Sequence, residues 1–286
     1  MNSLRQSIKA ATGSSVWLRY AFLAPWRLAY AAKATVTGTN ISGDRSNEDV
    51  EAYSRRTFGY YKTWSRIDHF YGRVAEVGPG NVSAIARMFL EDGCSQVDQV
   101  EKFVHRTGMS DERITLYREP AEEFFQAHQG YDFIVSCAVM EHLNDPLKAL
   151  RAMAAAVNRD GMMIHWIDCR DHNQFSDCLH DLSFLRIPPT LYWPLTLASG
   201  LNRVRRSAYL STLEPLGFTC EVLVTSLSGV AEMIIPARKF EDIDPALLER
   251  SRRNVAEIRP HLASPFRDMP DEELMISQFV LRAERK

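Results

Sequence analysis

Short apolar runs alternate with longer amphipathic stretches from about residue 73 to the end of the chain. The apolar runs predict strands over 73–77, 96–100, 114–117, 131–137, 162–167, 218–225 and 273–282. The amphipathic stretches predict helices over about 81–92, 120–128, 146–157, 203–214 and 245–258. Strands that alternate with helices at this spacing predict an α/β fold with a mostly parallel sheet.

Two regions depart from the alternation. Residues 1–35 predict a largely helical segment, followed by a polar loop over 37–47 and an aromatic-rich helix over 47–68. Residues 168–202 contain the pair Pro188-Pro189 and interrupt the pattern, as an inserted cap would. We therefore expect an N-terminal helical cap at 1–70, and one domain at 71–286 that carries an insertion at about 168–202.

Composition places the chain among ordinary globular proteins, with 45% hydrophobic and 24% charged residues. The formal net charge of −2 argues against a nucleic-acid partner. Five scattered cysteines without a CxxC spacing argue against a disulfide framework or a zinc site, so a cytoplasmic location fits best.

The stretch 16–33 is aromatic and alanine-rich, but Arg19, Arg27 and Lys33 interrupt it, so no transmembrane segment is expected. Packing on its own domain is the favoured interpretation, and contact with a membrane surface is the alternative. A homodimer is compatible with the sequence.

The first candidate for chemistry is the turn Gly78-Pro79-Gly80, which follows the predicted strand 73–77. Glycines let a ligand lie against bare backbone, and the following helix offers unpaired N–H groups. A tight connection without a ligand is the alternative. Ser83 stands where a dinucleotide fingerprint has its third glycine, which disfavours a pyrophosphate and, with it, a nucleotide-dependent dehydrogenase.

Glu101 stands at the predicted end of the second strand, about twenty residues beyond the turn. In a right-handed βαβ unit this acid lies near the turn and is able to accept both hydroxyls of a ribose. Asp98 is a rival, but it falls in the middle of the strand. The two features together predict a nucleoside site.

At this point the chain resembles the class I S-adenosylmethionine-dependent methyltransferases, in particular the branch that acts on small molecules. The matching stretches are 74–80, Glu101, 120–124, 131–146 with Glu141-His142, and 159–164. The resemblance implies a Rossmann-like fold, in which a mostly parallel seven-stranded sheet has an antiparallel last strand and helices on both faces.

The resemblance also implies roles for matching residues. Those that would hold S-adenosyl-L-methionine are Glu76, Gly78, Gly80, Glu101, Lys102, Pro120, Ala121, Glu122, Ser136 and Cys137. Many relatives have an Asp where Pro120 aligns, so a side-chain contact to the adenine amino group is not expected.

A second cluster, Asp168, Asp171 and His172, follows the predicted fifth strand. Methyl transfer to a hydroxyl benefits from a general base, and His172 oriented by Asp168 or Asp171 fits that role. His142 is the rival base, although a structural role at a helix start is favoured for it. A metal site built from these residues with His180 and Asp181 is a weaker alternative, because the spacing fits no standard site.

Candidate substrate-binding residues are Tyr60, Tyr61, Trp193 and Arg203. Packing is the simpler interpretation of the aromatic residues. The sequence thus predicts methyl transfer to a small molecule or glycan precursor, with oxygen favoured over nitrogen, sulfur or carbon. A non-catalytic nucleoside-binding protein on the same scaffold is the alternative from another functional class.

Overall fold

The computed structural model describes residues 12–13, 15–37, 50–80, 83–102, 111–175, 180–197 and 200–286. The part of the predicted helical segment that precedes residue 12 lies outside the described residues, and so does the predicted loop at 37–47 except for residue 37. None of the described helices is long and apolar enough to cross a membrane. The longer helices are α2 (Val16–Thr37), α3 (Val50–Ser65), α4 (Ala84–Asp92), α5 (Ala121–Ala127), α6 (Pro146–Ala156), α7 (Pro189–Tyr192), α8 (Arg206–Leu213), α9 (Pro245–Ile258) and α10 (Asp271–Met275).

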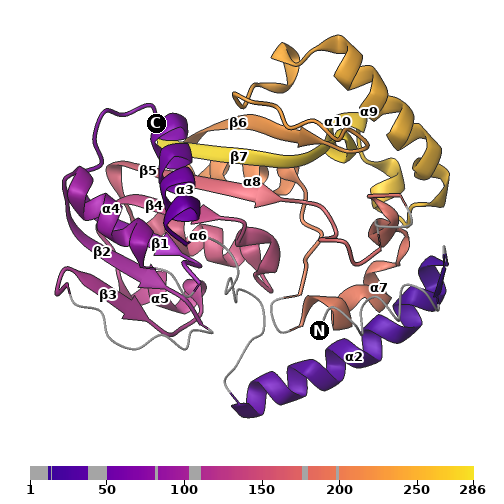
Figure 1. Cartoon of the computed structure of the whole chain (residues 1–286), viewed down its shortest axis with the longest axis horizontal. Helices are drawn as coiled ribbons and strands as arrows, with labels where there is room; N and C mark the ends of the chain where they lie inside the picture. Colours follow the sequence, from indigo (N-terminus) through magenta and orange to yellow (C-terminus); the bar gives the residue numbers. More distant parts are fainter. Residues whose placement is uncertain are drawn as a thin grey trace. The chain divides into compact units, whose positions relative to one another are not determined.

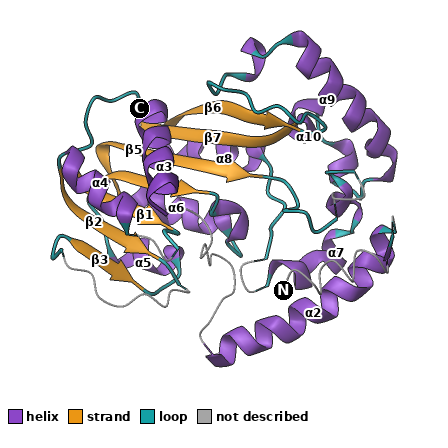
Figure 2. Cartoon of the chain, in the orientation of Figure 1, coloured by secondary structure: helices purple, strands orange, loops and turns teal. Residues whose placement is uncertain are grey.

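The described strands form a seven-stranded sheet in the order β3-β2-β1-β4-β5-β7-β6 (Figure 1, Figure 2). Their bounds are β1 (Gly72–Val77), β2 (Cys94–Val100), β3 (Ile114–Tyr117), β4 (Tyr131–Cys137), β5 (Val157–Asp168), β6 (Phe218–Leu227) and β7 (Ile276–Arg285). The pairs β1–β2, β1–β4, β2–β3 and β4–β5 are parallel, and β7 runs against them. The predicted α/β fold with an antiparallel last strand is confirmed.

The strand order reverses between β1 and β4, and this reversal sets the helix layers. Right-handed crossovers place the helix that joins β1 to β2 and the helix that joins β3 to β4 on opposite faces of the sheet. Accordingly α4 packs with α3, and α5 packs with α6. The carboxyl ends of β1, β2 and β4 therefore meet beside the reversal, where ligands bind in open sheets of this kind.

Aromatic side chains fill the layer between α3, α4 and the sheet. The rings of Phe70 and Phe89 lie 4.8 Å apart, and that of Phe70 also lies 4.9 Å from Phe133 of β4. Tyr61 of α3 stacks against Phe89 at 5.9 Å. These contacts anchor α3 on the sheet toward the amino ends of β1 and β4, since Phe70 precedes β1 and Phe133 is the third residue of β4.

Two predicted boundaries are wrong for identifiable reasons. The predicted turn at Asp160-Gly161 lies inside β5, where a side chain on Gly161 would approach the carbonyl oxygens of Tyr131 and Asp132 at 2.9 Å. The glycine is therefore needed for a close strand contact. The predicted last strand starts three residues too early, because Glu273 belongs to the short helix α10, whose first turn is acidic.

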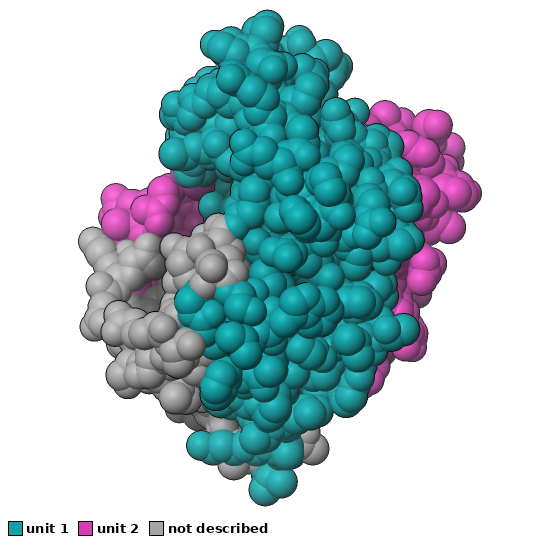
Figure 3. Space-filling view, turned by 90° about the vertical axis from the view of Figure 1, so that its right-hand side faces the viewer, with its two compact units in different colours: residues 1–37, 168–206, 223–279 teal, residues 38–167, 207–222, 280–286 magenta. Residues whose placement is uncertain are grey.

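The described chain divides into two compact units (Figure 3). Unit 1 comprises 1–37, 168–206 and 223–279, and unit 2 comprises 38–167, 207–222 and 280–286. Unit 2 holds β1 to β4, most of β5 and the helices α3 to α6. The expected cap at 1–70 contributes α2 to unit 1 and α3 to unit 2, and the boundary at residue 70 stays a prediction.

Candidate active site

The glycine turn follows β1 directly in unit 2. Gly78 has φ +72° and Gly80 has φ +61°, a backbone region that side chains rarely adopt. A Cβ on Gly78 would lie 2.3 Å from a methyl carbon of Val139, whereas a Cβ on Gly80 would meet nothing within 4 Å. The Gly78 amide donates to the carbonyl of Val100 at 2.9 Å and so ties the turn to the end of β2.

Glu76 is a buried acid inside β1, with 2% of its surface exposed. Gln99 of β2 donates to its carboxylate at 2.6 Å. Burial raises the pKa of the nearby Tyr61 hydroxyl well above its ordinary value, and the charges of Cys137 and Glu76 add to the effect. Tyr61 of α3 therefore lies within electrostatic range of two of the residues expected at the cofactor.

Glu101 and Asp98 are the two candidates for binding the ribose hydroxyls, and their surroundings differ. Asp98 is fully buried and accepts from Arg73 at 3.0 Å and from Tyr131 at 2.7 Å. Glu101 is half-buried, follows the last residue of β2, and its amide donates to the carbonyl of Tyr117 at 3.0 Å. The acid at the strand end is Glu101, as the sequence predicts.

The remaining residues expected at the cofactor also lie in unit 2. Lys102 is exposed directly after Glu101, and Pro120 caps the helix α5, which starts with Ala121 and Glu122. Ser136 and Cys137 are the last residues of β4. All of them follow or end a strand at the carboxyl side of the sheet, or begin the helix after β3.

Ser136 has a partner inside the sheet that its sequence neighbourhood does not indicate. Its hydroxyl lies 2.8 Å from Nδ1 of His165, which is the neighbouring residue across the β4–β5 ladder. His165 is completely buried, burial lowers its pKa to about 4, and its Nε2 has no hydrogen-bond partner. Gln99, the partner of Glu76, is a second contact that the sequence does not indicate. For both His165 and Gln99, the one available signal is a polar residue inside an apolar strand.

The cluster predicted after the fifth strand lies in unit 1, where Asp168 ends β5. Asp168 is 5% exposed and accepts from Arg170 Nη2 at 2.7 Å and from Gln278 at 2.8 Å. Nε2 of His172 lies 3.5 Å from the same carboxylate. Burial acts to raise the pKa of Asp168, but the hydrogen bonds from His172 and Arg170 outweigh it and hold that pKa well below its ordinary value.

His172 itself stands in an unusual backbone conformation. It has φ +48°, and the next residue, Asn173, has φ +59°. Asp171 stabilises this turn, because its carboxylate accepts from the amides of Asn173 and Phe175 at 3.1 and 2.5 Å. Asp171 therefore shapes the backbone, and Asp168 is the acid beside the imidazole. Strained non-glycine residues of this kind cluster at functional sites.

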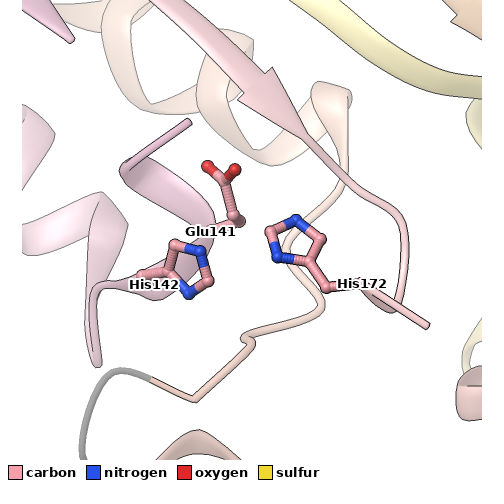
Figure 4. Close-up of side chains that lie close together, drawn as sticks. All are labelled: Glu141, His142 and His172. Atoms are coloured by element: carbon pink, nitrogen blue, oxygen red, sulfur yellow. The ribbon is translucent and has the colours of Figure 1, made fainter. Parts of the chain in front are cut away.

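Glu141 and His142 belong to the short 3₁₀ helix η1 (Met140–His142) of unit 2. Glu141 is 2% exposed, and His142 is half-buried. The amide of His142 donates to the carbonyl of Val139 at 2.8 Å, the residue that packs against Gly78. Figure 4 draws these two side chains together with the ring of His172, which belongs to the other unit.

The carboxylates that the sequence offers for a metal site already accept hydrogen bonds from donors of the protein. Asp181 accepts from Ser228, from the amide of Gly229 and from Asn254, at 2.8 to 3.1 Å. Asp168 and Asp171 have the donors described above. These three acids of unit 1 therefore fit structural roles better than a cation site.

The predicted substrate residues differ in their surroundings. Tyr60 of α3 stacks on Trp64 with ring centroids 5.2 Å apart, and Trp193 is 55% exposed. The Arg203 guanidinium lies between the rings of Tyr192 and Phe266, at 3.8 and 4.6 Å from their centroids. It also donates to the carbonyls of Phe184 and Ile187. Arg203 is thus engaged within unit 1, which argues against its predicted role toward an anionic substrate.

Comparison with solved structures finds many chains of related fold but low identity. A SAM-dependent methyltransferase from Archaeoglobus fulgidus has 10% identity and a TM-score of 0.48, with 81% of this chain and 94% of that chain covered. Phosphoethanolamine N-methyltransferase 2 from Haemonchus contortus, in complex with S-adenosyl-L-methionine, has 14% identity and a TM-score of 0.48, with 81% and 52% covered. The YcgJ protein from Bacillus subtilis has 13% identity and a TM-score of 0.48, with 81% and 99% covered. No curated protein matches the sequence.

The sequence itself carries a family assignment that does not depend on these structures. Residues 34–221 match the methyltransferase domain family, which is 188 of the 286 residues. The matched range includes the glycine turn, Glu101, η1 and the Asp168–His172 cluster. The chain belongs to the methyltransferase domain family, and it is a class I enzyme that uses S-adenosylmethionine as its methyl donor.

Proposed function

We propose that the chain transfers the methyl group of S-adenosylmethionine to a hydroxyl oxygen of a small molecule or glycan precursor. The observation that carries the choice of oxygen is the pair formed by His172 and Asp168. A hydroxyl must lose its proton during methylation, and an imidazole beside a carboxylate is suited to accept it near neutral pH. An amine or a sulfide acceptor needs no such base.

For the cofactor we propose the residues of unit 2 at the carboxyl ends of β1, β2 and β4. The turn fits the methionyl part, because Gly80 leaves the backbone bare where a ligand approaches, while Gly78 makes room for Val139. Glu101 fits the ribose hydroxyls, since its carboxylate follows the strand end and is only half-buried. Position 83 holds a serine where a dinucleotide fingerprint has a glycine, which fits a nucleoside without a pyrophosphate.

Further contacts follow from the same placement. Glu76 would hold the cofactor's amino group, Ser136 and Cys137 would line the methionyl side, and the start of α5 would flank the adenine with Lys102 at its border. Tyr60 of α3 and Trp193 of unit 1 are proposed substrate contacts, whereas Tyr61 is 1% exposed and stacks on Phe89, which fits a packing role better. The sulfonium of the donor supplies an activated methyl carbon, so the protein's task is alignment and proton removal.

In unit 1 the proposed base is His172, and Asp168 is its positioning residue. The Asp168 carboxylate is fixed by Arg170 and Gln278, so it holds a constant place from which to orient the imidazole. Its lowered pKa keeps it ionised at neutral pH. The ionised form favours the imidazolium produced when the base takes the acceptor's proton.

The first experiment tests the cofactor site alone. Titration calorimetry of the full chain with S-adenosylhomocysteine should show binding, and Glu101→Ala should weaken it by about tenfold to a hundredfold, because two ribose hydroxyls lose their acceptor. Glu112→Ala, an exposed acid in the segment before β3, is the matched control and should bind as the wild type does. Undetectable binding by the wild-type chain would contradict a functional cofactor site.

The second experiment tests the base. A panel of hydroxylated and aminated acceptors is screened by mass spectrometry for the gain of one methyl group. With an oxygen acceptor, His172→Ala should lower turnover by about 10²–10⁴ and leave the affinity for S-adenosylhomocysteine unchanged. His261→Ala removes an exposed histidine of the same unit and is expected to leave turnover unaffected.

The outcomes separate the alternatives. An unchanged rate in His172→Ala together with a large loss in His142→Ala assigns the base to η1. Methylation of amines alone, with no effect of either substitution, contradicts the choice of oxygen. Binding without turnover on any acceptor favours the non-catalytic scaffold.

A further inference from the structure

Two buried polar side chains lie next to each other on one face of the sheet in unit 2. Glu76 of β1 is 2% exposed, and Gln99 of β2 is fully buried. They are direct partners in the parallel β1–β2 ladder, and Nε2 of Gln99 donates to the Glu76 carboxylate at 2.6 Å. A buried amide and a buried carboxylate are costly unless they are hydrogen-bonded, so each fixes the position of the other.

The other residues of the same row across the sheet are apolar. The ladders place Val135 of β4 beside Glu76 and Leu116 of β3 beside Gln99. Side chains at one register position of parallel strands share a face of the sheet. Within this row of four residues, Gln99 is therefore the one polar neighbour of the acid.

The next row on the same face contains residues proposed to hold the cofactor. Side chains alternate between the two faces along a strand, so positions two residues apart share a face. Gly78 lies two residues beyond Glu76, and Glu101 lies two residues beyond Gln99. The ladders continue through both, because their amides donate to carbonyls of β2 and β3 at 2.9 and 3.0 Å. The Glu76–Gln99 pair thus lies one row, about 7 Å, below the glycine turn and the acid at the strand end.

The neutral donor distinguishes Glu76 from the other buried acid of these strands. Asp98, on the opposite face of β2, accepts from the Arg73 guanidinium at 3.0 Å and so has a cation beside it. The Gln99 amide carries no charge, so its hydrogen bond orients the Glu76 carboxylate without cancelling the negative charge. N–H donors stabilise the ionised form of a carboxylate, which is the form that attracts an ammonium group.

We propose that Gln99 is a positioning residue of the cofactor site. Its amide holds Oε2 of Glu76, so that the carboxylate meets the ammonium of the methionyl part of S-adenosylmethionine in a fixed orientation. This role of Gln99 rests on the proposed cofactor site, in which Glu76 binds that ammonium. Selectivity for ligands that carry the ammonium then depends on a residue that does not itself touch the ligand.

The test compares two ligands by titration calorimetry of the full chain. S-adenosylhomocysteine carries the methionyl ammonium, whereas 5′-methylthioadenosine keeps the adenosine and lacks the amino acid. Gln99→Met removes the amide and preserves the length of the side chain. It should weaken binding of S-adenosylhomocysteine by about tenfold and that of 5′-methylthioadenosine by less than about twofold. A merely structural role of Gln99 would change both affinities together, so the ratio of the two dissociation constants is the decisive quantity.

Gln96→Met is the matched control. Gln96 belongs to the same strand, and its amide donates to the Asp98 carboxylate at 2.7 Å. The same substitution there removes a bond of the same kind away from the proposed cofactor residues, and both ligands should bind as they do to the wild type. Urea unfolding establishes that each variant is folded. If Gln99→Met does not fold, Gln99→Asn keeps an amide, shortens its reach by one methylene and should change the same ratio to a smaller extent.

A double-mutant cycle tests whether Gln99 acts through Glu76. Glu76→Gln alone should weaken binding of S-adenosylhomocysteine by about tenfold or more, because the ammonium loses its charged partner. Adding Gln99→Met to Glu76→Gln should cause no further loss, since no carboxylate is left to position. Independent, multiplying losses would contradict the proposed role.

Two further results would overturn the role of Gln99 and leave the cofactor site intact. One is a Gln99→Met variant that binds both ligands as the wild type does, and the other is an equal loss of affinity for both. Failure of the cofactor site has a different signature, because the wild type would then bind neither ligand. That result would overturn the proposed site and the role of Gln99 together.

Discussion

Gly78 shows how one residue determines the shape of the proposed cofactor turn. Replacing it with alanine combines a positive φ with a Cβ that would lie 2.3 Å from Val139. We expect Gly78→Ala to lose about 2–4 kcal/mol of unfolding free energy, from backbone strain and overpacking together. We also expect at least a tenfold loss of affinity for S-adenosylhomocysteine. Urea unfolding and titration calorimetry measure the two quantities.

Gly217→Ala is the control for strain alone. Gly217 has φ +82° at the end of a short helix, and a Cβ there would meet nothing within 4 Å. This variant should lose about 1–2 kcal/mol of stability and retain its affinity for S-adenosylhomocysteine. Equal effects of the two substitutions on that affinity would argue against a specific role of the turn.

His165 predicts a pH dependence that a surface histidine would not produce. Burial lowers its pKa to about 4, whereas the unfolded chain has the ordinary value of about 6.5. The unfolded state therefore binds more protons between these values, and stability must fall as the pH drops from about 6.5 to 4, by up to about 3 kcal/mol. Urea unfolding across this range should show the slope in the wild type and a much smaller slope in His165→Asn. Equal slopes would contradict the buried neutral imidazole.

Residue-level chemistry was predictable where it depended on neighbours in the sequence. The length of the apolar run predicts Glu101 at a strand end, and the pair Asp145-Pro146 is typical of a helix start, where Asp145 accepts from the amide of Lys148 at 2.9 Å. The partner of Ser136 was not predictable, because His165 reaches it only through the pairing of β4 with β5. Long-range pairing of this kind has no local signal.

At the scale of elements, a polar cluster joins three separate segments of unit 1. Asp181 accepts from Ser228 and Gly229, which follow β6, and from Asn254 of α9. Nε2–H of the adjacent His180 donates to the carbonyl of Asn254 at 2.7 Å. The cluster holds α9 against the end of β6, and neither the acid nor the serine is free for chemistry.

This cluster gives a stability prediction with a defined pH window. Burial opposes ionisation of Asp181, but hydrogen bonds from His180, Ser228 and Gly229 outweigh it and lower its pKa to about 2. The unfolded value is about 3.9, so the contribution is complete above about pH 5 and is lost as the pH falls toward 2. At pH 6 Asp181→Asn should cost about 2 kcal/mol of unfolding free energy, and the difference should shrink on acidification. Asp160→Asn, at an exposed position of β5, serves as the control.

Some elements were predicted well and others were not, for physical reasons. The strand at 114–117, the strand at 131–137 and the helix at 245–258 match their observed bounds, because an apolar run or a Pro-bounded stripe ends where the element ends. The helix predicted over 203–214 begins only at Arg206. Arg203 is held by two carbonyls and two aromatic rings from other segments, which a periodic pattern does not encode.

At the scale of the whole molecule, the residues proposed to hold the cofactor all belong to unit 2. Ligand binding stabilises only what folds together with the site, by about 2.7 kcal/mol at a free concentration one hundred times the dissociation constant. Saturating S-adenosylhomocysteine should therefore slow hydrogen exchange in peptides that cover the ends of β1, β2 and β4. Peptides of α9 and of the turn at Ser228 should change little.

Mass spectrometry of the exchanging amides measures this contrast directly. Glu101→Ala, which is expected to bind weakly, should show no such protection at the same ligand concentration. Protection that is equal throughout both units would instead indicate that the chain unfolds as a single cooperative body. Protection confined to unit 1 would contradict the proposed cofactor site.

The division of the chain between the two units constrains how such a protein evolves. Six segments alternate between unit 1 and unit 2, so the polypeptide passes from one to the other five times, three of them within the strands β5, β6 and β7. No single deletion or crossover of the gene exchanges unit 1 while leaving unit 2 whole. We therefore expect unit 1 to change by substitutions in place and to be inherited together with unit 2.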